Sequence, residues 1–355
     1  MKIGINALCI KENNSGVGIT ALELCRQLQK YDLKNEYYIY AFPSQALTGI
    51  KIIPVIKIGN TRLYRIFCEH FILPFYYKKH KLAGVIYPAY VSSFFSRLPA
   101  VLIIHDLFVY SHASLCKKSN VIYFRLLLPF SIKQAEYIIC PSEFTRQQII
   151  KYFPHHAEKT TIIKWGGDHI LIQRNKKSVI NKKKYLLFAG NIEPKKNIQY
   201  FMDLAAFCRA QGFKIKCMII GEYGWAEQKL FRRLAADKTI IYKGYIPENK
   251  KYACFRSALC LVVPSLIEGF GLTAAEAFFC DTPVFSSNQG ALKEFNISRR
   301  TVFDIKKPID SSHPLIKFLK NQQLKEKIIK DYSAQRKIYT WKNAAMAMSK
   351  ILNNF

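Results

Sequence analysis

Short apolar runs alternate with longer amphipathic stretches along most of the chain. An apolar run of about four to eight residues bounded by turn residues is typical of a buried strand, and apolar residues three and four apart are typical of a helix. The pattern predicts strands at 2–10, 37–42, 84–87, 101–104, 137–140 and 161–165, and helices at 19–31, 119–135 and 143–152. Such an alternation predicts a parallel sheet covered by helices.

The alternation stops at residues 169–184, whose lysines and asparagines predict a polar linker. It starts again with strands at 185–189, 214–220 and 239–243, a helix at 197–211, and a strand-loop-helix unit at 261–278. We therefore expect an α/β fold with two doubly wound, Rossmann-like domains facing a cleft, at residues 1–168 and 185–335. Residues 336–355 are helical in pattern, and part of this stretch is expected to pack back on the first domain.

The strand-loop-helix unit at 261–278 has a loop suited to an anionic ligand. Gly269 and Gly271 allow the backbone to approach a ligand closely, and the helix is expected to begin near Leu272 with its free N–H groups facing the loop. Glu268 lies in the loop and Glu276 about one turn inside the helix, so the two carboxylates could flank one elongated ligand such as a nucleotide sugar. The alternative is that Glu276 caps the helix or faces solvent.

Two further loops of the first domain follow predicted strands, where open parallel sheets bind ligands. The loop with Gly16 and Gly18 opens a helix and could face an anion, but it lacks the third glycine of a dinucleotide fingerprint, which argues against NAD. His105 ends the strand at 101–104 and could bond a substrate hydroxyl or accept a proton. The alternative is a histidine that is hydrogen-bonded inside its own loop.

In the second domain, the loop after strand 185–189 contains Pro194 and Lys196. A proline suits the first turn of a helix, and a lysine beside a helix N-terminus suits a diphosphate because it adds a full charge to the helix dipole. The alternative for Lys196 is a solvated surface lysine. After strand 239–243, the ring of Tyr245 and the backbone around Ile246 could hold a base.

Composition limits the class of protein. With 355 residues, half of them hydrophobic, the chain can form two sizeable cores. It has no apolar run near the ~20 residues that span a bilayer, and residues 1–8 resemble a first strand rather than a signal peptide, so we expect a cytoplasmic protein. The ten cysteines form no C-x-x-C pair, so they predict core packing rather than zinc or redox chemistry.

The formal net charge of +30 predicts an anionic partner, although abundant lysine can also reflect a compositional bias of the source. The chain has no nucleic-acid recognition motif, so nucleic acid is not the expected partner. Residues 61–81 mix aromatic and basic side chains in the manner of a surface-lying membrane helix. The alternative is a helix packed on its own sheet with a solvated basic edge.

Taken together, these residues resemble the retaining glycosyltransferases of the GT-B fold, the glycogen-synthase-like family four, and most closely its mannosyltransferase-like members. The resemblance rests on the E-x7-E signature formed by Glu268 and Glu276, followed by 280–284. It also rests on the segments 15–18, 88–90, 104–107, 141–145, 189–197 and 244–247. These matches are spread over nearly the whole chain.

The resemblance implies that a nucleotide sugar lies mostly on the second domain. It assigns the ribose hydroxyls to Glu276, the sugar hydroxyls to Glu268, the diphosphate to Lys196, and the base to Tyr245 and Ile246. The backbone of Gly269, Phe270, Gly271 and Leu272 would bind sugar and phosphate, beside Gly190 and Asn191, while Gly16, Gly18 and His105 would close the site from the first domain. Many relatives have arginine where this chain has Asn191, so diphosphate binding would depend more on Lys196.

The implied activity keeps the anomeric configuration and needs neither a metal nor a cofactor. Lys196, Glu268 and His105 are its expected catalytic residues. A hexose, for example mannose from GDP-mannose, would pass to a lipid-linked or polysaccharide acceptor at the inner face of the cell membrane. The alternatives are a nucleotide-sugar epimerase of the same fold, and a non-catalytic basic protein that binds membrane or nucleic acid.

Overall fold

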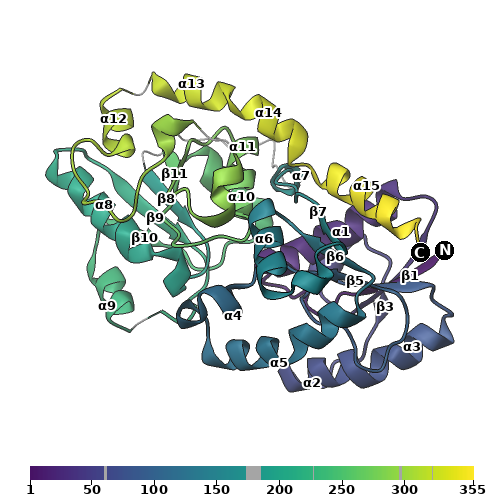
Figure 1. The fold of residues 1–355 in the computed structure, drawn as a ribbon. Coiled ribbons are helices and arrows are strands. Elements are labelled where there is room, and N and C mark those ends of the chain that lie inside the picture. Colours follow the sequence, from purple (N-terminus) through teal and green to yellow (C-terminus); the bar gives the residue numbers. More distant parts are fainter. Residues whose placement is uncertain (60–61, 173–184, 227, 296–297, 322) are drawn as a thin grey trace. The chain divides into compact units, whose positions relative to one another are not determined.

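A computed structural model describes residues 1–59, 62–172, 185–226, 228–295, 298–321 and 323–355. The chain forms two compact units, which Figure 1 shows as a ribbon. Unit 1 contains Met1–Trp165 and Trp341–Phe355, and unit 2 contains Gly166–Thr340. Each unit has its own all-parallel sheet covered by helices, which confirms the expected α/β class with two doubly wound domains.

Unit 1 is built on a seven-stranded sheet in the order β3-β2-β1-β4-β5-β6-β7. Its strands are β1 (Lys2–Asn6), β2 (Glu36–Ala41), β3 (Ile53–Pro54), β4 (Gly84–Tyr87), β5 (Ala100–Ile103), β6 (Tyr137–Cys140) and β7 (Thr160–Ile162). The chain first adds strands on one side of β1 and then on the other. The switch point therefore lies between β1 and β4, and ligands of open parallel sheets bind at such points.

The helices of unit 1 include three segments that follow one another directly, of which the middle one is a π turn. They are α1 (Gly16–Tyr31), α2 (Arg62–Phe67), the π turn η2 (Cys68–Ile72), α3 (Leu73–Lys79), α4 (Phe108–Ser111), α5 (Lys118–Gln134), α6 (Glu143–Tyr152) and α15 (Trp341–Leu352), with short 3-10 turns η1 (Gln45–Leu47), η3 (Ala113–Leu115) and η4 (Pro154–His156). Thr61, the first residue of the predicted surface segment, lies outside the described residues.

The prediction that Gly16 and Gly18 lie in a loop is wrong, because α1 begins at Gly16. Ile19 N–H already donates to the Ser15 carbonyl at 2.9 Å, which closes the first helical turn. Glycine is a weak helix former, and this local preference predicted a loop. A Cβ on Gly18 would lie 2.2 Å from Asn14 Oδ1, so a larger residue here would displace the Asn14 side chain.

Helix α15 belongs to unit 1 although it ends the chain. It packs along α1, and the Trp341 ring stacks on Trp165 with centroids 5.9 Å apart. The C-terminal ring of Phe355 lies over Gly84, where a Cβ would come within 2.4 Å of it. Unit 1 therefore contains both the first and the last residues of the sequence.

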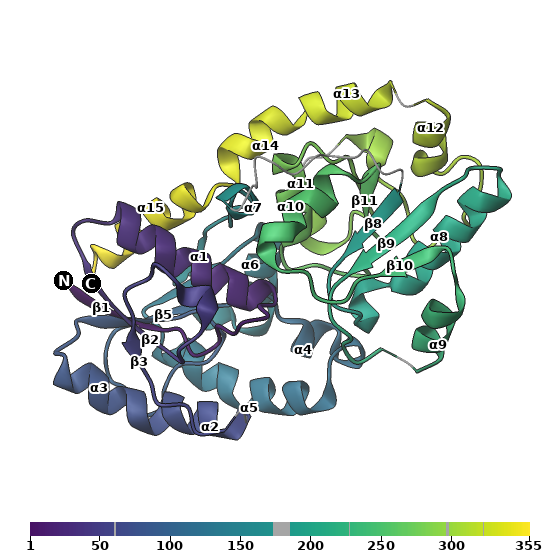
Figure 2. The ribbon, with the colours of Figure 1, turned by 180° about the vertical axis from the view of Figure 1, so that it is seen from behind.

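Unit 2 is built on a five-stranded sheet in the order β10-β9-β8-β11-β12. Its strands are β8 (Tyr185–Ala189), β9 (Lys216–Ile220), β10 (Ile240–Tyr242), β11 (Cys260–Val263) and β12 (Val284–Ser286). Its helices are α7 (His169–Ile172), α8 (Ile198–Ala210), α9 (Gln228–Ala236), α10 (Glu248–Arg256), α11 (Leu272–Phe279), α12 (Pro314–Lys320), α13 (Leu324–Lys330) and α14 (Tyr332–Ile338), with 3-10 turns η5 (Pro194–Lys196), η6 (Gly290–Phe295) and η7 (Arg299–Thr301). Figure 2 shows these elements from behind. The switch point of this sheet lies between β8 and β11.

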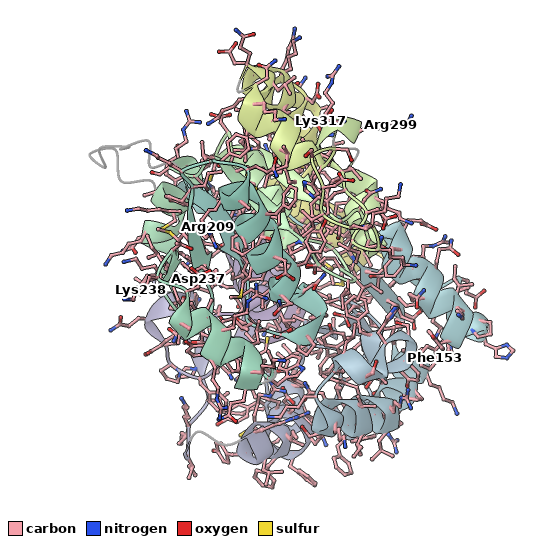
Figure 3. All side chains as sticks on the ribbon, turned by 90° about the vertical axis from the view of Figure 1, so that its left-hand side faces the viewer. Phe153, Arg209, Asp237, Lys238, Arg299 and Lys317 are labelled. Atoms are coloured by element: carbon pink, nitrogen blue, oxygen red, sulfur yellow. The ribbon has the colours of Figure 1, made fainter. Side chains whose placement is uncertain are left out.

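Residues 169–172 were predicted to belong to a linker. They instead form the short helix α7 of unit 2. The remaining linker residues, 173–184, lie outside the described residues. Ion pairs tie the outer elements of unit 2 together, as between Arg209 near the end of α8 and Asp237, whose Nη2 and Oδ2 atoms are 3.2 Å apart (Figure 3). Burial raises the pKa of the neighbouring Cys217 thiol to about 12, which fits a packing role for this cysteine.

Candidate functional site

Lys196 and Glu268 meet at the switch point of the unit 2 sheet. Lys196 ends the turn that follows β8, and Glu268 lies in the loop after β11. Because β8 and β11 are adjacent and parallel, these loops begin at the same edge of the sheet. The Lys196 Nζ atom lies 2.7 Å from Glu268 Oε1, and Leu266 N–H donates to the Lys195 carbonyl at 2.8 Å. Two predicted residues 72 positions apart are thus in direct contact.

The carboxylate of Glu268 is buried but keeps one oxygen available. The Ser265 hydroxyl donates to the same Oε1 atom at 2.7 Å, and its backbone carbonyl accepts from the Ser287 hydroxyl at 2.6 Å. Among the described residues no partner contacts Oε2. Burial by itself would raise the pKa of Glu268, but Lys196 and the hydrogen bonds lower it below its usual range. Glu268 is therefore an ionised acceptor at neutral pH.

The loop between Glu268 and α11 depends on glycines. Gly271 has a φ of +102°, which favours glycine, and a Cβ there would lie 2.7 Å from Leu292 Cδ2. Helix α11 begins at Leu272, as predicted, so its first N–H groups face this loop. The ring of Phe270 packs on Phe295 with centroids 5.5 Å apart. This contact fixes the Phe270 ring, which is half-buried, beside the loop.

Glu276 lies in a separate, closed cluster. Its side chain is fully buried, and its Oε1 atom contacts His169 Nε2 at 2.9 Å and Lys251 Nζ at 2.5 Å. Burial alone would raise the pKa of Glu276, but Lys251 and His169 lower it. For His169 burial opposes the charged form, yet the hydrogen bond to Glu276 raises the pKa of the imidazole. The alternative, that Glu276 caps α11 or faces solvent, is therefore wrong.

The second oxygen of Glu276 has no hydrogen-bond partner among the described residues, although it is buried. Buried carboxylate oxygens are normally satisfied, so this atom can accept a bond from a ligand or a water. The backbone explains how His169 reaches this position. A Cβ on Gly167 would lie 2.4 Å from the Ala275 carbonyl carbon and oxygen, so only glycine allows the segment before α7 to pack against α11.

The same cluster does not fit a divalent metal. His169, Glu248 and Glu276 offer ligand atoms within 4.8 Å of one another. The Lys251 ammonium already lies 2.5 Å from Glu276 and 3.5 Å from Glu248, and both carboxylates raise the pKa of this lysine. An added divalent cation would be repelled at short range by a charged lysine. The cation of this site is therefore Lys251.

The loop after β8 also holds Gly190 and Asn191. Gly190 has a φ of +143°, and the adjacent Gly221 approaches it so closely that a Cβ on Gly221 would lie 2.1 Å from the Gly190 carbonyl oxygen. The Asn191 side chain accepts from Glu222 N–H at 3.3 Å. The loops after β8 and β9 are thus held together, and Asn191 has a structural partner.

Tyr245 and Ile246 follow β10 at the same edge of the sheet and are half-buried. The loops after β9 and β10 are joined by a bond of 2.8 Å from Gly221 N–H to the Gly244 carbonyl. All predicted residues of unit 2 except Glu276 therefore lie in loops, or at the first residue of α11, along one edge of the sheet. Glu276 lies one turn inside that helix.

In unit 1, His105 follows β5 and its Nε2 atom lies 2.8 Å from the Pro88 carbonyl oxygen, in the loop after β4. The alternative that His105 bonds within its own loop is wrong. A carbonyl only accepts, so Nε2 carries the proton and Nδ1 is an acceptor. Burial lowers the pKa of His105, which favours the neutral form. Gly16 begins α1 after β1, so Gly16 and His105 lie at the same edge of the unit 1 sheet.

Four residues around the two carboxylates were not predicted: Ser265, which bonds Glu268, His169 and Lys251, which bond Glu276, and Glu248, which contacts His169 and Lys251. Glu248 and Lys251 are three apart at the start of a helix, directly after the predicted base loop, so this pair was open to prediction. His169 is 107 positions from Glu276, and no local pattern links them. The one available signal was the pair Gly166 and Gly167, which marks a close approach of the backbone.

A hollow of about 650 Å³ on unit 2 lies beside the candidate site. Segments after β12 and around α12 line it, including Ser287, Lys293, Lys306 and His313. None of the predicted donor residues lines it. The hollow is therefore distinct from the Lys196–Glu268 pair, although Ser287 also contacts Ser265.

No helix in the described part of the chain is both long and apolar enough to span a bilayer.

Two family models match the sequence: "Glycosyltransferase Family 4" over residues 14–169 and "Glycosyl transferases group 1" over residues 170–335. O-antigen chain mannosyltransferase B of Escherichia coli is 27% identical over 69% of this chain and 67% of its own length. O-antigen chain mannosyltransferase RfbU of Salmonella typhimurium is 28% identical over 47% of this chain and 46% of its own length.

Solved structures of glycosyltransferases share the fold. Anabaena HepE in complex with UDP and glucose has a TM-score of 0.74 at 15% identity, covering 100% of both chains. WaaG, a glycosyltransferase involved in lipopolysaccharide biosynthesis, has a TM-score of 0.72 at 14% identity, also over 100% of both chains. The two family models together cover residues 14–335. The chain therefore belongs to the family 4 glycosyltransferases with the GT-B fold.

Proposed function

We propose that this glycosyltransferase moves a hexose from a nucleotide sugar to a lipid-linked or polysaccharide acceptor of a cell-surface glycan. The single observation that carries the proposal is the Lys196–Glu268 pair, 2.7 Å long, at the switch point of the unit 2 sheet. The names of the two O-antigen mannosyltransferases that resemble the chain support mannose as the sugar. GDP-mannose is then the donor to test first.

In this proposal Lys196 binds the diphosphate together with the free N–H groups at the start of α11. Negative charge grows on the diphosphate as the sugar leaves, and a fixed cation and a helix dipole stabilise that charge without reorganisation. Many relatives have arginine where this chain has Asn191, whose side chain here accepts a hydrogen bond from Glu222 N–H. Lys196 and the dipole therefore take the role that other enzymes give to a divalent ion.

Glu268 is proposed to bind hydroxyls of the transferred sugar through its Oε2 atom. Its Oε1 atom is already bonded to Lys196 and Ser265, which fixes the carboxylate in place. We assign it to orientation and electrostatic stabilisation of an oxocarbenium-like state, and not to covalent attack. We further propose a front-face route with retention of configuration, in which His105 accepts a hydrogen bond from substrate through Nδ1.

Glu276 is proposed to accept the ribose hydroxyls through its unpartnered Oε2 atom. His169 and Lys251 hold the other oxygen, so the carboxylate is oriented before the donor arrives. Tyr245 and Ile246 would lie by the base, and Gly190 and Gly269 would let the backbone approach the donor. We further propose that the enzyme works at the inner face of the cell membrane, where its net charge of +30 attracts anionic lipid.

The test is transfer of labelled sugar from a panel of nucleotide sugars to a lipid-linked acceptor. We expect one donor to be used, the product to keep the anomeric configuration, and Glu268→Gln and Lys196→Met each to reduce kcat about 100-fold. Lys195→Met is the matched control, because Lys195 pairs with Glu193 at 3.5 Å and adds less than Lys196 to the positive field at Glu268; it should change kcat by about twofold at most.

Three results would contradict the proposal. Release of an altered free sugar without acceptor would indicate an epimerase. Binding to lipid or nucleic acid with no turnover of any donor would indicate a non-catalytic protein. Equal activity of the Lys196→Met and Lys195→Met variants would remove the role of the switch-point lysine.

A further inference from the structure

Large apolar side chains are exposed on neighbouring helices of unit 1. Four of them, Leu63, Phe67, Phe71 and Phe75, lie along the α2–η2–α3 segment and are between 49% and 77% exposed. The opposite side of the same segment is buried in the core of unit 1 through Cys68, Leu73 and Tyr77. The core contact therefore leaves a second apolar face of this segment exposed.

The π turn reduces the winding of the stripe that these four side chains form. In a regular α-helix, positions four apart are rotated by about 40°, so a stripe over twelve residues would wind by about 120°. The turn η2 (Cys68–Ile72) has i→i+5 hydrogen bonding, which rotates the chain less per residue and offsets this drift. The rings of Phe67 and Phe71 are accordingly in contact, with centroids 5.2 Å apart.

A second stripe lies on α5. Ile122, Leu126 and Phe130 are spaced four apart and are 38% to 74% exposed. Arg62 at the start of α2 donates to Asn120 of α5 at 2.8 Å, so the two stripes lie on neighbouring helices, and Figures 1 and 2 both show α2, α3 and α5 side by side.

The loop after β4 bridges the two stripes. Phe95 contacts Phe71 with centroids 5.0 Å apart, and Phe94 contacts Phe130 at 4.4 Å. Isolated exposed apolar residues are common on proteins, but a continuous set marks an interaction surface. We call this set the aromatic surface; it consists of Leu63, Phe67, Phe71, Phe75, Phe94, Phe95, Ile122, Leu126 and Phe130.

Charge around the aromatic surface has one sign. Between residues 42 and 135 the only acidic residues are Glu69 and Asp106, and Glu69 is buried beside Arg65 at 3.4 Å. The exposed basic residues on the same elements are Arg62, Lys78, Lys79, Arg97, Lys117, Lys118, Arg125 and Lys133. Aromatic rings flanked by lysine and arginine suit the headgroup level of an anionic bilayer.

We propose that the aromatic surface is the face by which unit 1 inserts into the interfacial layer of an anionic phospholipid bilayer. The proposal rests on the proposed function, since a lipid-linked acceptor brings the enzyme to a membrane, and it names the side chains that enter it. A second copy of the chain is a poorer occupant, because two faces with this uniform positive charge would repel each other. The alternative of a merely solvated basic edge does not account for the exposed rings.

The experiment is flotation of the full-length protein with phosphatidylcholine vesicles that contain or lack phosphatidylglycerol. We expect binding only with phosphatidylglycerol, and a decrease of at least tenfold for the triple variant Phe71→Ser, Phe75→Ser and Leu126→Ser, because interfacial binding scales with buried apolar area. The variant Lys78→Gln with Lys79→Gln should lose about fivefold for each charge removed.

Two variants are matched controls for these changes. Leu33→Ser alters a residue that is 88% exposed in the turn between α1 and β2, outside the aromatic surface. Lys229→Gln with Lys238→Gln removes two exposed lysines of unit 2. Both should bind vesicles like the wild type. Because every substituted residue is exposed, unchanged thermal unfolding of the variants would show that they are folded.

Equal vesicle binding by the aromatic variants and the controls would overturn the proposal. So would a concentration-dependent dimer that the aromatic substitutions dissociate while vesicle binding is absent. The result is separable from the proposed function. Vesicle binding that needs the aromatic surface, in a protein that turns over no donor, would support this inference and contradict the enzymatic one.

Discussion

Glu268 and Glu276 belong to one short stretch of sequence, yet they lie in different surroundings. Glu268 has Lys196 and Ser265 on one oxygen and no hydrogen-bond partner on the other within the described part of the chain, and the lysine side chain is 21% exposed. Glu276 is fully buried, and the side chains of His169 and Lys251 that hold it are 4% and 12% exposed. The first carboxylate can change partners when a ligand binds, whereas the second joins α7, α10 and α11. Substitution of Glu268 should therefore affect mainly activity, and substitution of the partners that hold Glu276 should affect mainly stability.

The largest expected effect on stability comes from Lys251→Met. It leaves the buried Glu276 with His169 as its only remaining basic partner among the described residues, and breaking a buried ion pair in this way costs about 3–5 kcal/mol. Urea unfolding followed by circular dichroism would measure it. Lys250→Met alters the exposed neighbour and should change the free energy of unfolding by less than about 0.5 kcal/mol. Equal values for the two variants would remove the distinction between the carboxylates.

A smaller effect is expected from His169→Gln, and it should depend on pH. The folded-state pKa of His169 is raised by Glu276, so its charged form stabilises the fold below the unfolded pKa of about 6.5, and this contribution is lost as pH rises through the folded pKa. The difference in unfolding free energy between wild type and variant, on the order of 1 kcal/mol, should thus shrink as pH rises through the raised folded pKa. A difference that stays constant from acid to alkaline pH would contradict the charged pair.

Local patterns predicted what depends on neighbours in the sequence. The start of α11 at Leu272 and the alternation of strands and helices follow from apolar periodicity and glycine punctuation. The meeting of Lys196 with Glu268 was implied by placing both after parallel strands. The predictions that were wrong concern features that depend on tertiary packing. Gly16 and Gly18 are helical because α1 packs on the unit 1 sheet and α15, against their own propensity.

The partners of Glu276 show the same limit. Residues 169–172 have a polar, lysine-rich sequence after them, which predicted a linker, but α7 packs on α10 and α11. His169 makes its decisive contact 107 positions away, and Gly167 permits it only because the backbone at Ala275 lies against it. A contact of this kind is set by the packed unit and not by any window of sequence.

The most direct test of the switch-point site is calorimetric titration with nucleoside diphosphates, GDP first and UDP second. The account predicts that the wild type binds one of them and that Lys196→Met weakens this binding by about 10- to 100-fold, the loss of a charge-assisted bond of ~1.5–3 kcal/mol. Lys195→Met should bind within about twofold of the wild type. Failure of the wild type to bind any nucleoside diphosphate, or equal binding by Lys196→Met, would contradict it.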